Sequence, residues 1–338
     1  MSADAAKAVD VLLRIEDLRV VFDTDEGTVS AVNGVTLDVR RGETLGLVGE
    51  SGCGKSVTAL SVLRLVPRPP GRFVSGRIVF RGEDLLSLPI ARLSAIRGGA
   101  IGMIFQEPMT ALSPLHRVGN QLVEALSFHR SVSGGEARGI ALSWLRKVGT
   151  PDPDRCYDAY PHQLSGGMRQ RAMIAMALLL GPELVIADEP TTALDVTIQA
   201  QVLELMREMR GPGTSILLIT HDMGVVWEMC DRVAVMYSGE VMETGTVDEV
   251  IRRPLNPYTE ALLESVPANV PVGGRLPVIA GQVAAAGEGL VGCRFAPRCR
   301  YAFDRCRGEH PDLEAFGAGA SRCWLASERY ERGRKAGA

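Results

Sequence analysis

The stretch that decides the fold runs Gly49-Glu50-Ser51-Gly52-Cys53-Gly54-Lys55-Ser56 and matches the pattern G-x-x-x-x-G-K-[ST] in full. A short apolar run, Thr44–Val48, precedes it, and a helical pattern begins at Lys55. Glycines let backbone N–H groups curl around phosphate oxygens, and the start of a helix adds its positive dipole end. All residues of this loop are therefore predicted to contact a nucleotide, with Lys55 at the β- and γ-phosphates and Ser56 on Mg²⁺.

A second motif follows another apolar run. Leu184–Ala187 reads as a buried strand, and two adjacent carboxylates, Asp188 and Glu189, follow it. Functional residues of a parallel sheet gather at the carboxyl ends of its strands. Asp188 is predicted to hold Mg²⁺, directly or through water, and Glu189 to orient or deprotonate an attacking water. The two motifs together predict a nucleoside triphosphatase, without deciding its kind.

The kind is decided by Leu164-Ser165-Gly166-Gly167-Met168-Arg169-Gln170-Arg171. This stretch resembles the LSGGQ signature of the ABC ATPase family, with Met168 where the family has Gln. A Ser hydroxyl and glycine N–H groups before a helix, expected from Met168 onward, form another anion site. Ser165, Gly166 and Gly167 are therefore predicted to contact nucleotide, and the change at Met168 is expected to matter little.

Further motifs of the family follow in the expected order. Gln106 resembles the Q-loop glutamine, which senses Mg²⁺ and the water and couples to a partner. Thr192–Asp195 resembles the D-loop, which places Asp195 at a dimer interface, and His221 resembles the switch histidine that contacts the γ-phosphate. Phe22 is positioned like the aromatic residue that stacks on adenine, although an aromatic residue of a core strand would give the same pattern. The predicted catalytic residues are thus Gln106, Glu189 and His221.

Leu12–Phe22 and Ala31–Val39 alternate apolar and polar residues as strands do, and short apolar runs predict further strands along the chain. The predicted ranges are Leu12–Phe22, Ala31–Val39, Ile78–Phe80, Ile101–Phe105 and Ile216–Ile219, with Gly27 in the turn between the first two. From Gln106 to about Ala177 the pattern is mostly helical.

The resemblance implies an α/β fold over residues 12–265. The expected fold is a P-loop NTPase domain of the ABC ATPase type, with a RecA-like core, an antiparallel β subdomain and a helical subdomain inserted at about residues 107–177. Residues 1–11 are expected to form an N-terminal tail and residues 266–338 a small cysteine-containing C-terminal domain. ATP and Mg²⁺ are the implied cofactors. ATP would lie between the phosphate-binding loop of one protomer and the signature motif of another.

Composition limits the partners and the location. The 338 residues carry a formal net charge of −3, which argues against a general nucleic-acid-binding protein because such proteins have a strong basic excess. The N-terminus lacks the pattern of a signal peptide, and the longest apolar runs fall far short of the roughly 20 residues that span a bilayer. We therefore expect an intracellular protein, peripheral at the cytoplasmic face of the membrane and attached through partners.

Four stretches carry a finer resemblance, namely Phe105–Pro114, Ala193–Gln201, Asn256–Thr259 and Gly292–Cys299. They look like the ATPase subunits of oligopeptide and dipeptide ABC importers, a family that also includes nickel and other small-solute systems. The resemblance implies two permease subunits, a second ATPase chain (a paralogue or another copy) and an extracytoplasmic binding protein. Gln106–Pro114 and the helices after it would form the groove that receives a permease coupling helix. A soluble ABC ATPase that acts on a macromolecule is the alternative.

Four of the seven cysteines, Cys293, Cys299, Cys306 and Cys323, cluster with the spacing C-x5-C-x6-C-x16-C. Thiolates in a short, loop-rich segment suit Zn²⁺ or an iron–sulfur cluster, and a metal would also stabilise such a segment. The spacing matches neither the common zinc pattern nor the ferredoxin patterns. The family resemblance favours a [4Fe–4S] cluster over zinc, and reduced structural thiols or disulfides are the further alternative.

Overall fold

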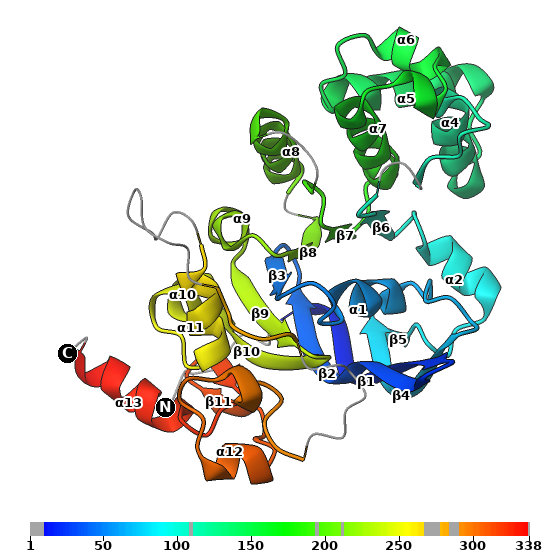
Figure 1. Cartoon of the computed structure of the whole chain (residues 1–338). Helices are drawn as coiled ribbons and strands as arrows, with labels where there is room; N and C mark the ends of the chain where they lie inside the picture. Colours follow the sequence, from blue (N-terminus) through cyan, green and yellow to red (C-terminus); the bar gives the residue numbers. More distant parts are fainter. Residues whose placement is uncertain are drawn as a thin grey trace, which may run out of the picture.

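The structure, a computed structural model, describes residues 10–107, 111–192, 196–210, 213–266, 278–283 and 291–336. Asp195 and most of the predicted N-terminal tail lie outside these ranges. Figure 1 shows a body that contains the sheets and, apart from it, a lobe made of helices.

The larger sheet carries the phosphate-binding loop. Its strands, in spatial order, are β11 (Glu314–Phe316), β12 (Gly319–Ser321), β10 (Glu240–Thr246), β9 (Arg232–Tyr237), β3 (Thr44–Val48), β8 (Ser215–Thr220), β7 (Leu184–Asp188) and β6 (Ile101–Ile104). Neighbouring strands are parallel from β9 to β6 and antiparallel from β9 to β11. Every residue of β3, β7 and β8 is buried, as expected for strands covered on both faces. The sequence predicted β3, β6, β7 and β8 correctly but not β9 or β10.

The smaller sheet is antiparallel throughout. Its spatial order is β2 (Gly27–Arg40), β1 (Val11–Thr24), β4 (Gly71–Phe80) and β5 (Glu83–Asp84). Asp25 and Glu26 form the turn between β1 and β2, and Gly27 is the first residue of β2 rather than part of the turn. The predicted alternation of buried and exposed residues in β1 and β2 is confirmed, with irregularities at several register shifts.

Helices connect the strands and form the separate lobe. The lobe holds α4 (Val118–His129), α5 (Gly134–Lys147), α6 (Pro153–Asp158), the 3-10 helix η1 (Pro161–Gln163) and α7 (Gly166–Leu178). The described helices outside the lobe include α1 (Lys55–Val62), α2 (Ile90–Ile96), α8 (Val196–Met209), α9 (Met223–Met229), α10 (Val247–Arg252) and α11 (Pro257–Glu264). The lobe packs around buried apolar side chains such as Leu122, Leu145 and Met173. No helix of the described residues combines the length and the apolar character that a membrane span needs.

The C-terminal region adds to the main sheet. It contains η3 (Ala296–Arg298), α12 (Asp304–Gly308), β11, β12 and α13 (Ala326–Ala336). Strand β12 pairs with β10, where Ser321 lies opposite Glu243. Phe295 shares a buried apolar cluster with side chains of β9, β10 and α11. The described part of the predicted C-terminal domain is therefore continuous with the core of the ATPase domain.

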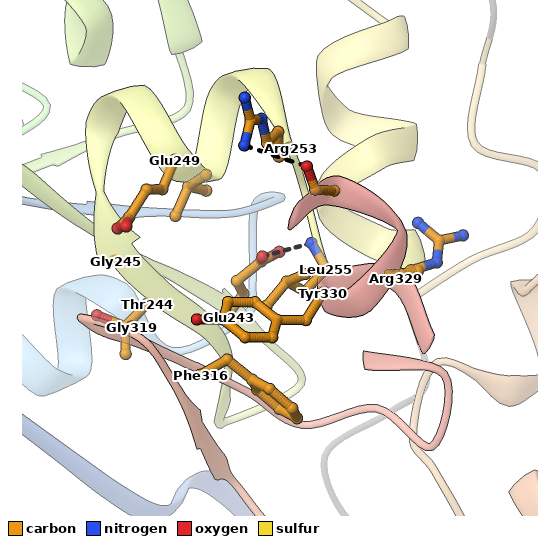
Figure 2. Close-up of a pocket in the computed structure, with 12 residues that line it drawn as sticks. Glu243, Thr244, Gly245, Glu249, Arg253, Leu255, Phe316, Gly319, Arg329 and Tyr330 are labelled. Carbon is orange, nitrogen blue, oxygen red and sulfur yellow. Dashed lines mark hydrogen bonds between the residues drawn. The ribbon is translucent and has the colours of Figure 1, made fainter. Parts of the chain in front are cut away.

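Glu243 is buried at this junction. Figure 2 shows it beside Tyr330, in a cavity between β10, α10 and α13. Its carboxylate accepts hydrogen bonds from the N–H groups of Leu255 (2.6 Å) and Asn256 (3.1 Å). Burial nevertheless raises the pKa of Glu243 to about 7. At neutral pH this side chain is therefore near the midpoint of its titration.

The raised pKa of Glu243 predicts a pH-dependent stability. Between its ordinary pKa of 4.5 and about 7, the folded protein keeps a proton that the unfolded chain releases. The unfolding free energy is therefore expected to fall, by up to about 3 kcal/mol, as the pH rises through this window. Chemical denaturation at several pH values would measure the slope for the wild type and for Glu243→Gln, whose slope is expected to be flatter.

The control is Glu314→Gln, which removes an exposed carboxylate of the neighbouring β11. It is expected to keep the wild-type slope. Equal slopes in Glu243→Gln and the wild type would show that Glu243 does not titrate in this range.

Candidate functional site

The phosphate-binding loop follows a backbone path that needs glycine at both ends. Gly49 has a φ of 154° and Gly54 a φ of 102°. A Cβ atom at Gly49 would lie 2.1 Å from the carbonyl oxygen of Met236, and one at Gly54 would lie 2.3 Å from that of Ala31. Any larger residue would displace the loop from the strands around it. The other predicted residues of the turn lie between these two, namely Glu50, Ser51, Gly52 and Cys53.

Lys55 is buried against the same loop. Its Nζ donates hydrogen bonds to the carbonyl oxygens of Gly49 (2.8 Å) and Glu50 (2.9 Å). A buried ammonium group must be hydrogen-bonded, but carbonyl groups are neutral acceptors. A phosphate in the loop would offer this charge a stronger partner.

Ser56 and Asp188 meet although 132 positions separate them in the sequence. The Ser56 hydroxyl donates to Oδ1 of Asp188 at 3.0 Å. Burial raises the pKa of Asp188 above its ordinary value, while the hydrogen bond from Ser56 opposes the shift. The pair therefore presents two oxygen ligands of the kind Mg²⁺ prefers, and the charge of a cation would favour the ionised carboxylate.

Glu189 and His221 also meet at this edge of the sheet. Nδ1 of His221 lies 3.3 Å from Oε1 of Glu189, and the Thr192 hydroxyl donates to Oε2 of Glu189 at 2.7 Å. Glu189 has a φ of 47°, which is uncommon outside glycine and often marks a functional position. The structure thus brings together two of the three predicted catalytic residues.

The remaining predicted site residues are less closely placed. Gln106 lies two residues after the end of β6 and is exposed. Phe22 is half-buried in β1, lies opposite Val29, and packs against the core of the body. These contacts are those of a strand residue at the edge of a core, so its stacking on adenine stays a prediction. Asp195 lies outside the described residues, so its position at an interface stays a prediction too.

The signature motif begins α7. Ser165 is the N-cap, and its hydroxyl accepts a hydrogen bond from the N–H of Met168 at 3.4 Å. The helix therefore starts at Gly166, two residues before the predicted start, because the cap precedes both glycines. Ser165 and Gly166 are exposed, and Gly167 is half-buried.

Helix α7 also reaches the carboxylate loop. The buried side chain of Gln170 donates a hydrogen bond to the carbonyl oxygen of Pro190, the residue after Glu189. One helix therefore carries the signature motif and contacts the loop after Glu189.

Comparison with known proteins identifies the family. The profile described as "ABC transporter" matches residues 32–192, and the profile "Oligopeptide/dipeptide transporter, C-terminal region" matches residues 242–306. The probable peptide ABC transporter ATP-binding protein y4tR of Sinorhizobium fredii is 51% identical over 94% of this chain and 96% of its own length. The chain belongs to the ABC transporter family.

Other relatives agree with this assignment. The dipeptide transport ATP-binding protein DppD of Bacillus subtilis is 47% identical over 96% of this chain and 97% of its own length. A solved dimeric ABC transporter cassette in a post-hydrolysis state, bound to ADP and Pi, has a TM-score of 0.63 and 27% identity, and covers 70% of this chain and 98% of that chain. The predicted fold is confirmed, and so is ATP hydrolysis coupled to transport.

ATP and Mg²⁺ are therefore the general cofactors of this ABC ATPase. The residues present fit both groups, since Lys55 presents its charge inside the loop and Ser56 lies against Asp188. A bound Mg²⁺ ion would neutralise charge that develops on the phosphates during transfer.

The four C-terminal cysteines come together around one cavity, as their clustering in the sequence predicts. None forms a disulfide, and burial raises the pKa of Cys293 to about 11 and that of Cys323 to about 12. Among the described residues, however, no group of three or more His, Cys, Asp or Glu side chains has the arrangement of a metal site. The cysteines are gathered, but they are not arranged around a common point as the ligands of a metal ion would be.

Two residues that contact the phosphate-binding loop were not predicted. The N–H of Glu50 donates to the hydroxyl of Tyr258 (3.0 Å), and the Glu50 carboxylate pairs with Arg298. Both residues lie in stretches, Asn256–Thr259 and Gly292–Cys299, that stood out only for their resemblance to the importer family. That resemblance was a signal, but it gave no reason to place them beside the nucleotide.

The contact between Glu189 and His221 predicts the effect of removing the carboxylate charge. Glu189→Gln is expected to bind ATP but to lower turnover by about 100-fold or more, because a positioned base contributes rate and little binding. Phosphate release would measure turnover, and a fluorescent ATP analogue would measure binding.

Glu208→Gln serves as the control, because Glu208 is an exposed carboxylate on α8. It is expected to behave as the wild type. Wild-type turnover in Glu189→Gln would remove Glu189 from the catalytic step.

Proposed function

We propose that this ABC ATPase is the motor of an importer for dipeptides or oligopeptides. The observation that carries the proposal is the meeting of Ser56 with Asp188 and of Glu189 with His221 at one sheet edge. These are the groups that a hydrolytic ATP site requires. The named transport functions of the relatives, which concern peptides, oligopeptides and dipeptides, support the choice of substrate.

The complete ATP site would form between two ATPase subunits. The loop at Gly49–Ser56 of one would face Ser165–Gly167 of the other, with Gln106, His221 and Asp195 at the closed interface. Exposure of Ser165 and Gly166 supports this arrangement, because their polar groups are open to a partner. The similar solved cassette is a dimer. Since phosphoryl transfer depends on positioning and charge, closure of the pair would complete the site and hydrolysis would reopen it.

A groove between the body and the helical lobe is the proposed permease site. Its lining includes Leu65 from the body, Phe105 after β6, and Phe128 from α4. The side chain of Gln121 holds the adjoining loop through hydrogen bonds to the main chain of Ser113 (2.8 and 3.0 Å). Phe128 is 69% exposed, and with the other apolar residues that line the groove it would offer a permease helix an apolar surface to bury.

The proposed assembly contains two permease subunits, a second related ATPase and an extracytoplasmic binding protein, with this chain peripheral at the cytoplasmic face. A tagged copy is expected to recover two polytopic proteins and an ATPase from detergent-solubilised host membranes. Phe128→Glu is expected to lose these partners while its own ATPase activity is unchanged, because a charge in an apolar groove opposes burial. Mass spectrometry of the eluates measures recovery.

Trp227→Glu is the matched control, since Trp227 is an exposed aromatic residue on α9 outside the groove. It is expected to recover the full set of partners. Recovery of the wild type from the cytosol alone, without membrane proteins, would overturn the proposed importer assembly and favour a soluble ABC ATPase. If the recovered complex transported nickel but not peptides, the proposal that its substrate is a peptide would be wrong.

We also propose that the four cysteines around the cavity bind a [4Fe–4S] cluster, with zinc as the alternative metal. Its support is the convergence of four unpaired thiols from separate segments on one cavity. Their present arrangement is not that of a metal-ion site, so metal binding would require the thiols to rearrange.

Anaerobically purified protein is expected to contain iron and to absorb broadly near ~400 nm. Cys299→Ser is expected to lose both signals, whereas Cys156→Ser, which changes a buried cysteine of the helical lobe, should keep them. If the purified protein contains zinc instead of iron, the alternative metal site is supported and the cluster is not. Protein without iron or zinc would leave the four cysteines as structural thiols.

A further inference from the structure

We propose that Arg298 is a positioning residue for ATP binding, which acts through Glu50 of the phosphate-binding loop. The inference deepens the proposed function and depends on the nucleotide site described there. It gives the C-terminal region, described above only for its packing and its cysteine cavity, a part in the nucleotide site.

Glu50 is held through all three of its polar groups. Its N–H donates to the hydroxyl of Tyr258 (3.0 Å), and its carbonyl oxygen accepts from Nζ of Lys55 (2.9 Å). Its carboxylate forms two parallel bonds with Arg298, of 2.7 Å to Nη1 and 2.9 Å to Nη2. Arg298 is thus joined through one residue to the lysine that is predicted to reach the phosphates.

Arg298 is itself fixed in place. Its side chain is 5% exposed, and its guanidinium also donates to the carbonyl oxygens of Ala280 (2.9 Å) and Ile279 (3.1 Å) and to the hydroxyl of Tyr237 (3.4 Å). With the two bonds to Glu50, every N–H of the guanidinium has an acceptor. Glu50 is the carboxylate that balances this buried charge, so the pair is required as a unit.

The charge of Glu50 explains why the pairing matters for ATP. A carboxylate in a loop that binds phosphates repels the ligand unless a cation neutralises it. Arg298 supplies that cation from 248 positions away in the sequence. Without Arg298, the loop would keep Lys55 but would also carry an uncompensated negative charge.

The segment that carries Arg298 is anchored between the loop and the cysteines. The ring of Phe295 packs on Tyr237 and Tyr258, with centroids 5.4 and 5.2 Å apart. Cys293 and Cys299 flank this segment and line the cysteine cavity. The position of Arg298 therefore depends on the same packing that gathers the cysteines.

The test uses the full chain with three variants: Arg298→Gln, Glu50→Gln, and the two combined. Arg298→Gln is expected to raise the KM for ATP about tenfold with little change in kcat, because the lost interaction serves ground-state and transition-state binding alike. The double variant is expected to return to within about threefold of the wild type, because it removes both charges together. Added salt should reduce the defect of Arg298→Gln by screening the charge of the unpaired Glu50 carboxylate.

The matched control is Arg300→Gln. Arg300 lies two residues away and also forms a two-bond pair with a carboxylate, that of Glu264, but half of its side chain is exposed. It is expected to keep the wild-type KM, because exposed ion pairs contribute little. Thermal unfolding of all variants would separate a loss of folded protein from a change in affinity.

Two results would overturn the proposal. One is that Arg298→Gln leaves KM unchanged and lowers kcat and the unfolding temperature together, which would indicate a loss of folded protein rather than of ATP affinity. The other is a double variant as defective as the sum of the single ones, which would mean that the two charges do not act on each other. If Arg298→Gln does not fold, Glu50→Gln compared with the Arg298→Lys variant tests the same pair. Direct binding of an ATP analogue is measured alongside the kinetics. A chain that binds ATP without hydrolysing it would contradict the proposed function, whereas the role of Arg298 would still be tested by the affinity for the analogue.

Discussion

The nucleotide site depends on the parallel strands that end together at one edge of the larger sheet. Strand β8 lies between β3 and β7, so the loop after β3, His221 after β8, and the carboxylates that end β7 share one edge. Neighbouring strands are separated by about 4.8 Å, and loops and side chains can bridge two such spacings. The hydrogen bond from Ser56 to Asp188 does so, and it closes the proposed Mg²⁺ site across the intervening strand.

Helix α7 links this edge to the surfaces where partners are proposed. Its first turn carries the exposed signature motif, and Gln170 then contacts the loop after Glu189. Met176, near its end, lines the groove that we assign to a permease. Because a helix is stiff over this length, a rotation of the lobe at the groove would also move the signature motif and the carboxylate loop. In the proposed assembly, one helix would therefore connect the permease groove with the proposed hydrolytic site.

The sequence predicted best where local pattern and chemistry coincide. The strand–loop–helix around Gly49–Ser56 and the short buried strands could be predicted because apolar runs, glycines and carboxylates occur at fixed spacing. Strands β9 and β10 carry no chemical motif that would have marked them in the sequence. The contacts of Gln170, Tyr258 and Arg298 with the site depend on tertiary packing over long sequence separations. Periodicity carries no information on such contacts, and the residue types alone are common on protein surfaces.

The acidic residue Glu50 in the phosphate-binding loop creates a need for a cation, which a distant part of the sequence supplies. Neutral residues would satisfy the backbone geometry of the turn, yet this loop carries an acid directly after Gly49, in the same loop as the lysine that is predicted to meet the phosphates. An acid there is compatible with anion binding only if a cation neutralises it, and a cation buried to that degree must be rigidly held. The C-terminal region meets both conditions, since it supplies Arg298 and packs Phe295 against Tyr237 and Tyr258. The same reasoning explains why this region is continuous with the main sheet, because a loosely attached domain would not fix a charge beside the nucleotide.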